Sequence, residues 1–300
     1  MMGSLIRNAV VVGASGNVGK EIAQELVKAG FDVTALTREG STAAFPENLT
    51  VKKVDYRSFE SLVSALEGQD AVVSAIATVA VGSQKILADA AVAAKVKRFI
   101  SSEFGVNTRT LGDSAIGKIL RGKVEVLDYI IEKSRENPWF TWNGVSSGLF
   151  FDWGLRAGSL GFDKSTKTAI IYDSGNEPVQ GSNLSFIGRA VAAILSRPEK
   201  TANQYLSIAS FNPSQNQILE ILESETGEKW KVEHASTAEQ EKIGLEKLSK
   251  GDFSAFSNLL RKHAYADGAD HAVEGDNSAN EFLGLREDDL AATLKEWLRT

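Results

Sequence analysis

The stretch VVGASGNVGKEIAQELVKAG, residues 11–30, constrains the fold more than any other part of this sequence. A run of β-branched residues leads into three glycines spaced three apart, and a segment with helical periodicity follows. In a strand–turn–helix unit, Gly13 permits a tight turn, Gly16 lets a pyrophosphate approach the backbone, and Gly19 lets the helix pack closely on the strand. The spacing therefore predicts a phosphate-binding turn that opens a βαβ unit.

The predicted helix after this turn adds donors to it. The first N–H groups of a helix have no partner within the helix, and the helix dipole places positive charge at the same end. We expect the backbone around Asn17 and Val18 to face the phosphates. The side chains of Ser15 and Asn17 add further donors.

The first half of the chain repeats the alternation of strand and helix. Helical segments are predicted at 17–30, 58–68 and 82–95. Short apolar runs separate them, at residues 9–12, 31–36, 51–54, 70–76, 98–102 and 139–145. This order predicts an α/β fold in which residues 1–150 form a Rossmann-type, doubly wound parallel sheet with right-handed crossovers.

Beyond residue 150 the alternation is less regular. We expect residues 151–300 to form a smaller α/β substrate-binding region, with about residues 180–210 packing back on the first domain. A helix at 186–198 should be halted by Pro198. A last helix is predicted over 286–300, with acidic residues in its first turn and basic residues near its end, as the helix dipole favours.

Composition narrows the classes of function. The chain has 300 residues, a formal net charge of −6 and no cysteine. These values argue against nucleic-acid binding and exclude disulfides, thiolate catalysis and cysteine-bound zinc. No metal site is predicted. No apolar run has the length of a membrane span, and strand pattern begins too early for a signal peptide, so a soluble, cytoplasmic protein is expected. Both a monomer and a homodimer fit the sequence.

Residues at the ends of the second, third and fourth predicted strands indicate which dinucleotide cofactor binds. An NAD site usually has an acidic residue after the second strand, whereas this chain has Arg38, whose guanidinium matches a 2′-phosphate. NADP(H) is therefore favoured over NAD(H), although Arg38 could also be a solvated surface residue. Asp55 either lies at the adenine edge or forms a plain turn. The mostly small residues at the end of the fourth predicted strand either leave space for the dinucleotide at the sheet edge or only allow close packing of the protein; they are Ala75, Ile76 and Ala77.

Two lysines compete for the proton-transfer role. Tyr129 and Lys133 have the spacing of the short-chain dehydrogenase pair. Lys133, however, comes where the helix ends, and that end lies away from the cofactor edge of a parallel sheet. Lys123 lies in the half of the helix that faces the cofactor. It would act as a base with a depressed pKa, or as a charged group that polarises a substrate oxygen, or it is a solvated helix residue.

Aromatic residues gather around one strand and its exit loop. Phe150, Phe151 and Trp153 would line a flat aromatic site at the carboxyl end of the strand, or they belong to the core.

Several motifs together resemble one family, the NmrA-like, isoflavone reductase-like branch of the atypical short-chain dehydrogenases. The similarity is strongest to fungal members and extends to the plant phenylcoumaran benzylic ether, pinoresinol–lariciresinol and isoflavone reductases. It covers about residues 9–210. The motifs are GASGNVG (13–19), Arg38, VDYRSFESL (54–62), KRFISSEFG (97–105), GKVEVLDYI (122–130) and VSSGLFFDWG (145–154).

This resemblance implies roles for individual residues. Lys123 would be the catalytic lysine at the start of its helix, and Phe104 would lie against the nicotinamide ring or the substrate. The segment that contains Gly148, Phe150, Phe151 and Trp153 would form part of the substrate wall. His271 would match a histidine that contacts substrate, or it is a solvated loop residue.

Two departures from the plant pattern affect these roles. No lysine follows Arg38, and Leu127 stands where the plant reductases have an arginine. The resemblance implies NADPH-dependent reduction of a small aromatic or phenolic metabolite. The alternative is a non-catalytic NmrA-like regulator that senses NADP(H).

Overall fold

A seven-stranded parallel sheet forms the centre of the molecule, whose computed structural model describes residues 5–300. The strand order is β11-β6-β5-β4-β1-β2-β3, so the order reverses beside β1, as in a Rossmann fold. The strands are β1 (Asn8–Val12), β2 (Asp32–Arg38), β3 (Thr50–Val54), β4 (Ala71–Ser74), β5 (Arg98–Ile100), β6 (Thr141–Ser146) and β11 (Gln204–Ser207).

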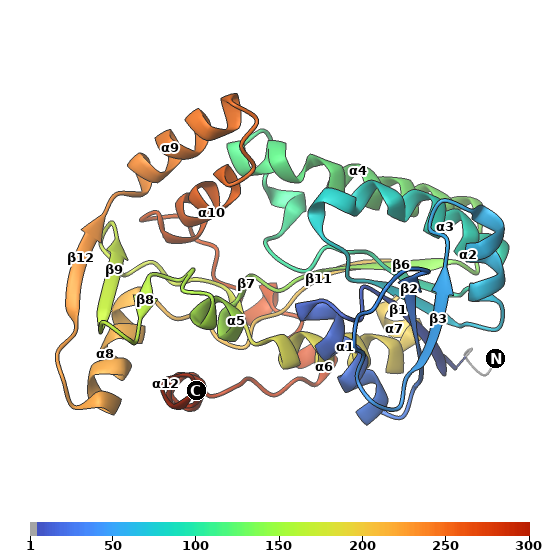
Figure 1. Cartoon of the computed structure of the whole chain (residues 1–300), viewed down its shortest axis with the longest axis horizontal. Helices are drawn as coiled ribbons and strands as arrows, with labels where there is room; N and C mark the ends of the chain where they lie inside the picture. Colours follow the sequence, from blue (N-terminus) through green and yellow to red (C-terminus); the bar gives the residue numbers. More distant parts are fainter. Residues whose placement is uncertain (1–4) are drawn as a thin grey trace.

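Helices cover both faces of this sheet, which explains why its central strands are apolar along their whole length (Figure 1). Alternate residues of β1 point into different cores: Ala9 and Val11 pack toward α1 and α6, and Val10 and Val12 toward α2, α3 and α4. These helices are α1 (Asn17–Lys28), α2 (Phe59–Leu66), α3 (Gln84–Ala93), α4 (Ala115–Glu136), α6 (Leu184–Ser196) and the short α7 (Pro198–Thr201).

Arg98 ties the last strands of the sheet to the α6–α7 corner. Its side chain is only 1% exposed, and it donates hydrogen bonds to Thr141, Asn143 and Thr201 and to the carbonyl of Pro198. Burial lowers the pKa of Arg98 to about 10, so the guanidinium stays charged at neutral pH. This network satisfies a cation that would otherwise be costly to bury.

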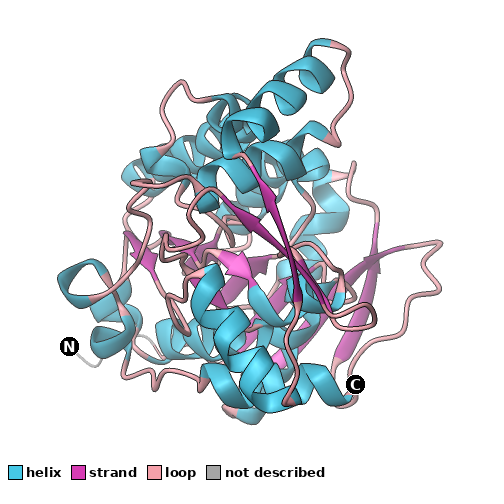
Figure 2. Cartoon of the chain, turned by 90° about the vertical axis from the view of Figure 1, so that its left-hand side faces the viewer, coloured by secondary structure: helices cyan, strands magenta, loops and turns pink. Residues whose placement is uncertain are grey.

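The remaining part of the chain forms an end of the molecule beyond the carboxyl edge of the sheet. Figure 2 faces this end of the molecule, where strands of the three-stranded sheet β12-β9-β8 cross in front of the helices. The sheet packs with α8 and α12 around a separate core that includes Phe162, Trp230 and Trp297. The elements here are β7 (Leu149–Phe150), α5 (Phe151–Arg156), β8 (Phe162–Asp163), β9 (Thr168–Tyr172), β10 (Gly181–Ser182), α8 (Gln215–Thr226), β12 (Lys231–Ala235), α9 (Thr237–Ser249), α10 (Ala255–Tyr265) and α12 (Leu290–Arg299). The short α11 (Asn280–Leu283) returns to the main sheet and packs against α6.

The α/β class and the parallel sheet predicted from sequence are confirmed, and α6 ends two residues before Pro198. One detail of the last helix is corrected: α12 begins at Leu290 with no acidic residue in its first turn. Asp289 precedes it as a cap and accepts a hydrogen bond from the Ala292 N–H. The domain division at residue 150 stays a prediction. Strand β11 and helix α6, which belong to the main sheet and its covering layer, come from residues after 150. Among the described helices, none has the length and apolar composition needed to cross a membrane.

Candidate active site

The glycine turn after β1 is closed by two very close backbone approaches. Gly13 has φ +88°, and a Cβ there would lie 2.4 Å from the Ala75 carbonyl oxygen. A Cβ on Gly19 would lie 2.1 Å from the Gly13 carbonyl oxygen. Only glycine therefore fits either position, which confirms the tight turn and the close helix packing predicted from their spacing. A Cβ on Gly16 would meet only the Gly13 oxygen, at 3.3 Å, so Gly16's pyrophosphate role stays a prediction.

The N-terminus of α1 presents free donors at this turn. The helix begins at Asn17, and Gly16 before it supplies no side-chain cap. The N–H groups of Asn17, Val18 and Gly19 consequently have no partner within the helix. Ser15 and Asn17 are exposed beside them. The turn thus has the features of an anion-binding site that is open to a ligand.

Arg38 is the last residue of β2 and lies exposed at the same edge of the sheet. Asp55 behaves locally as a turn residue, because its carboxylate accepts a hydrogen bond of 2.9 Å from the Arg57 N–H. Ala75, Ile76 and Ala77 follow β4, and the Ala75 carbonyl forms one side of the glycine turn.

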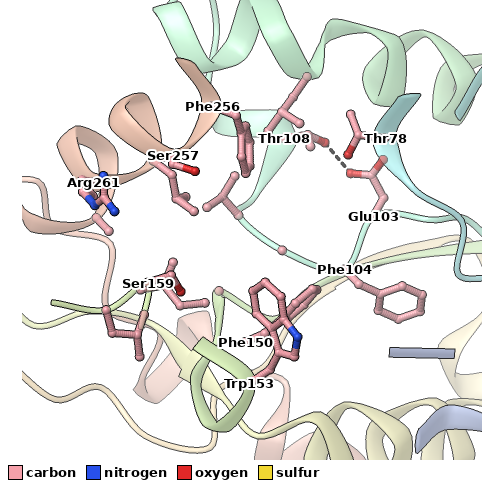
Figure 3. A pocket seen from close by; sticks show the side chains of 18 of the residues that line it. Thr78, Glu103, Phe104, Thr108, Phe150, Trp153, Ser159, Phe256, Ser257 and Arg261 are labelled. Carbon is pink, nitrogen blue, oxygen red and sulfur yellow. Dashed lines mark hydrogen bonds between the residues drawn. The ribbon is translucent and has the colours of Figure 1, made fainter. Parts of the chain in front are cut away.

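A cavity of about 320 Å³ opens beyond the carboxyl ends of β4, β5 and β6 (Figure 3). Asn17 lines it, so the cavity is continuous with the glycine turn. Thr78, Glu103 and Gly148 come from the loops after the three strands, and α10 closes the opposite side. The other lining residues are Phe104, Gly105, Val106, Thr108, Leu120, Lys123, Leu149, Phe150, Trp153, Ser159, Leu160, Phe256, Ser257, Leu260, Arg261, Ala264 and Tyr265.

Lys123 is the buried cation of this cavity. Its side chain is 8% exposed, and Nζ donates a 2.7 Å hydrogen bond to the backbone carbonyl of Glu103. Burial lowers the pKa of Lys123, and the Glu103 carboxylate offsets part of that effect. Lys123 is not at the start of its helix as expected: α4 begins at Ala115, where the Ser114 hydroxyl accepts the Gly117 N–H as a cap. The lysine lies in the third turn.

A buried hydrogen-bond network next to Lys123 was not found from the sequence. Glu103 is 1% exposed, and its Oε2 accepts hydrogen bonds from the hydroxyls of Thr108 and Tyr205. Burial, and secondarily the charge of Glu103, raises the pKa of Tyr205. The only signal in the sequence was the acidic residue in SSEFG, because Tyr205 comes from a strand about a hundred residues away.

The Tyr129–Lys133 pair does not reach the cavity. The Tyr129 hydroxyl donates to Asp89 at 2.6 Å, and Lys133 Nζ donates to Glu136 at 3.3 Å. Neither residue lines the cavity, and both point their polar groups to the outer face of α4.

Two residues predicted for the substrate site lie elsewhere. Phe151 is 2% exposed and packs edge-on against Phe211, with ring centroids 4.6 Å apart, so it belongs to the core. It is the first residue of α5, whereas its neighbour Phe150 ends β7 and lines the cavity. His271 stacks on His263, with ring centroids 3.9 Å apart, and lines a separate cavity.

The remaining substrate-site predictions are brought together. Phe104, Gly148, Phe150 and Trp153 all line the main cavity. The sequence missed the opposite wall, which α10 supplies through Phe256, Leu260 and Arg261. The sequence could not reveal this wall, because α10 follows β6 by more than a hundred residues and a local pattern does not show which element a helix packs against.

Comparisons with known proteins give matches over most of the chain. The NmrA-like family model matches residues 7–283. Oxidoreductase aprR of Aspergillus flavus is 36% identical over 280 residues, which cover 92% of this chain and 93% of that protein. Oxidoreductase poxI of Penicillium oxalicum is 34% identical over 282 residues, 92% of this chain and 88% of that protein.

Solved structures with low sequence identity share the fold. AtPrR2 with NADP+ and (+)pinoresinol has a TM-score of 0.79 at 21% identity, covering 99% of this chain and 100% of that chain. A ternary complex of leucoanthocyanidin reductase from Vitis vinifera has a TM-score of 0.80 at 15% identity, covering 98% of this chain and 100% of that chain. The crystal structure of an isoflavone reductase has a TM-score of 0.77 at 20% identity, covering 97% of this chain and 99% of that chain.

Proposed function

The chain belongs to the NmrA-like family, and from this premise we propose that it is an NADPH-dependent oxidoreductase that reduces a small aromatic or phenolic metabolite. The related structures support the cofactor, since AtPrR2 was solved with NADP+ and a leucoanthocyanidin reductase with NADPH. The names of the fungal relatives support the class of reaction.

The residues present fit NADP(H). Gly13 and Gly19 have no room for a side chain, and the N–H groups at the start of α1 have no partner within the helix. These groups would hold the pyrophosphate, and Arg38 would hold the 2′-phosphate with its guanidinium. The nicotinamide end would then enter the cavity past Asn17.

When bound, NADPH supplies the hydride. The chain's own task is to hold the substrate and to manage one proton. Lys123 Nζ uses one donor on the Glu103 carbonyl and keeps two others. Because burial lowers its pKa, protonated Lys123 gives up a proton to a substrate oxygen more readily than an exposed lysine does. We assign it the role of polarising that oxygen and supplying its proton.

The walls of the cavity favour a flat apolar substrate. Phe150 and Trp153 lie on one side and Phe256 on the other, as Figure 3 shows. A cavity with aromatic walls and few polar groups suits an aromatic ring system that is oriented by a small number of hydrogen bonds. The phenolic substrate class rests on this lining and on the names of the relatives.

The single observation that carries the proposal is the placement of buried Lys123 in a cavity that Asn17 joins to the glycine turn. The test is NADPH oxidation across a panel of lignans, isoflavones and quinones. Lys123→Met should abolish turnover while NADPH still binds. Tyr129→Phe is the matched control and should keep full activity, because Tyr129 bonds only to Asp89 on the outer face. Full turnover in Lys123→Met would refute the assigned role.

A second experiment tests the cofactor. Arg38→Gln should weaken NADPH binding about 100-fold, because a bidentate charge-assisted contact to the 2′-phosphate is lost, and should leave NADH binding nearly unchanged. Arg57→Gln, an exposed arginine near the same sheet edge, provides the control for loss of charge. Equal losses for both cofactors in Arg38→Gln would rule out recognition of the 2′-phosphate.

A further inference from the structure

The cavity has a second cation, and it lies at the end away from Lys123. Figure 3 shows Arg261 on the opposite side of the cavity from Glu103, whose backbone carbonyl accepts the Lys123 hydrogen bond. Ser159 and Ser257 lie beside Arg261, and the aromatic residues lie between the two ends. The cavity is therefore polar at both ends and apolar in its middle.

Arg261 has no partner of its own among residues 5–300. Other arginines are bound: Arg189 pairs with Asp288, and Arg98 is held by three side chains and a carbonyl. No carboxylate forms an ion pair with Arg261, and no hydrogen bond involves its guanidinium. Its charge acts on the phenols of Tyr172 and Tyr265, but burial raises the pKa of both, so they are neutral at pH 7 and form no ion pair with it.

The position of Arg261 follows from the pattern of α10. Ser257, Arg261 and Tyr265 are four residues apart and form one row along the helix, and Phe256, Leu260 and Ala264 form the adjacent row. Both rows line the cavity. Arg261 is thus the one charged residue among these six, in a chain whose net charge is negative. A half-buried cation placed in this way lowers its free energy most by binding an anion from the ligand.

We infer that Arg261 selects substrates that have a carboxylate at the end remote from the reacting group, so that the enzyme acts on an aromatic carboxylic acid. This rests on the proposed reductase function and narrows its substrate class. Lys123 does not provide the same selection, because one of its donors is already used by the Glu103 carbonyl and the Glu103 carboxylate lies nearby. The guanidinium offers a carboxylate two parallel N–H donors.

The experiment measures binding alone, with the full chain saturated with NADP+. The probes are biphenyl-4-carboxylate and biphenyl-4-carboxamide, which share a shape and differ in charge. Calorimetry gives the Kd of each probe for the wild type, Arg261→Gln and Lys262→Gln. Lys262 is adjacent on α10 but lines the separate cavity, so its variant controls for the same loss of one positive charge. Circular dichroism and NADP+ affinity confirm that each variant is folded.

The wild type and Lys262→Gln should bind the carboxylate about 10- to 100-fold more tightly than the amide, and Arg261→Gln should bind both equally. Arg261→Lys should restore part of the preference, since it returns the charge without the planar fork. The inference is overturned if the wild type shows no preference or binds neither probe, or if the preference survives in Arg261→Gln. These outcomes leave the proposed reductase activity standing, because its tests depend on Lys123 and Arg38.

Discussion

Replacing Gly19 with alanine tests how the glycine turn works. The new Cβ would lie 2.1 Å from the Gly13 carbonyl oxygen and 2.7 Å from its carbonyl carbon, both backbone atoms that cannot rotate away. Restoring ordinary contact requires α1 to move by roughly 1 Å relative to the turn, because interiors are close-packed. The free N–H groups at the start of α1 would move with the helix.

The expected magnitude follows from competing terms. Alanine favours a helix interior over glycine by roughly 1 kcal/mol, whereas overpacking costs about 1–3 kcal/mol. We therefore expect Gly19→Ala to lower the free energy of unfolding by at most about 2 kcal/mol. The larger effect should fall on NADPH. Each charge-assisted hydrogen bond lost from the phosphate weakens binding by about 10- to 100-fold.

The assay combines NADPH titration by fluorescence with urea unfolding of the same protein. Gly30→Ala is the matched control, because Gly30 has φ +87° but a Cβ there would meet nothing within 4 Å. That variant should lose about 1 kcal/mol of stability from backbone strain and keep its NADPH affinity. Wild-type NADPH affinity in Gly19→Ala, or equal loss of affinity in Gly30→Ala, would refute the reasoning.

Two further predictions concern Phe151 and His263, the stacking partner of His271, which lie outside the main cavity. Phe151→Ala should lower the free energy of unfolding by about 3–5 kcal/mol, as expected for a core phenylalanine. Phe150→Ala should lower it far less and should instead weaken substrate binding. Equal losses of stability for the two variants in urea unfolding would contradict this. Burial, with a smaller contribution from His271, lowers the pKa of His263 to about 4, so its unfolded state takes up a proton first as pH falls. The wild type should lose stability as the pH falls from about 6.5 to about 4. The difference in free energy of unfolding between His263→Asn and the wild type should therefore shift in favour of the variant by roughly 1–2 kcal/mol when the pH is lowered from about 7.5 to about 5. A difference that does not change with pH would argue against a neutral, buried His263.

Local patterns predicted the parts of the site that local geometry controls. The spacing of Gly13 and Gly19 encodes the close contact between these two residues within one turn, so the sequence was enough to assign it, whereas the contact of Gly13 with Ala75 joins β1 to β4. The short runs likewise predicted every strand of the main sheet up to β6. The central strands are apolar because helices cover both faces of the sheet, whereas the edge strand β3 has two lysines and is mostly exposed. Lys123 was identified because it lies in the N-terminal half of its helix, and that half faces the edge of the sheet where the cofactor is expected.

Long-range contacts account for what the sequence did not reveal. The Glu103–Tyr205 hydrogen bond and the approach of α10 to the cavity join segments a hundred or more residues apart. Phe150 and Phe151 are adjacent and chemically identical, and only the change from β7 to α5 between them sends one to the cavity and the other to the core. His271 was assigned from the family resemblance alone and lies in a loop, where position in the sequence carries little geometric information.

The most direct test of the central claim is a crystal structure of the complex with NADP+. The account predicts the pyrophosphate on the N–H groups of Asn17, Val18 and Gly19, the 2′-phosphate against Arg38, and the nicotinamide ring inside the cavity beside Lys123. A pyrophosphate bound away from the glycine turn, or a nicotinamide ring outside the cavity that Lys123 lines, would contradict it.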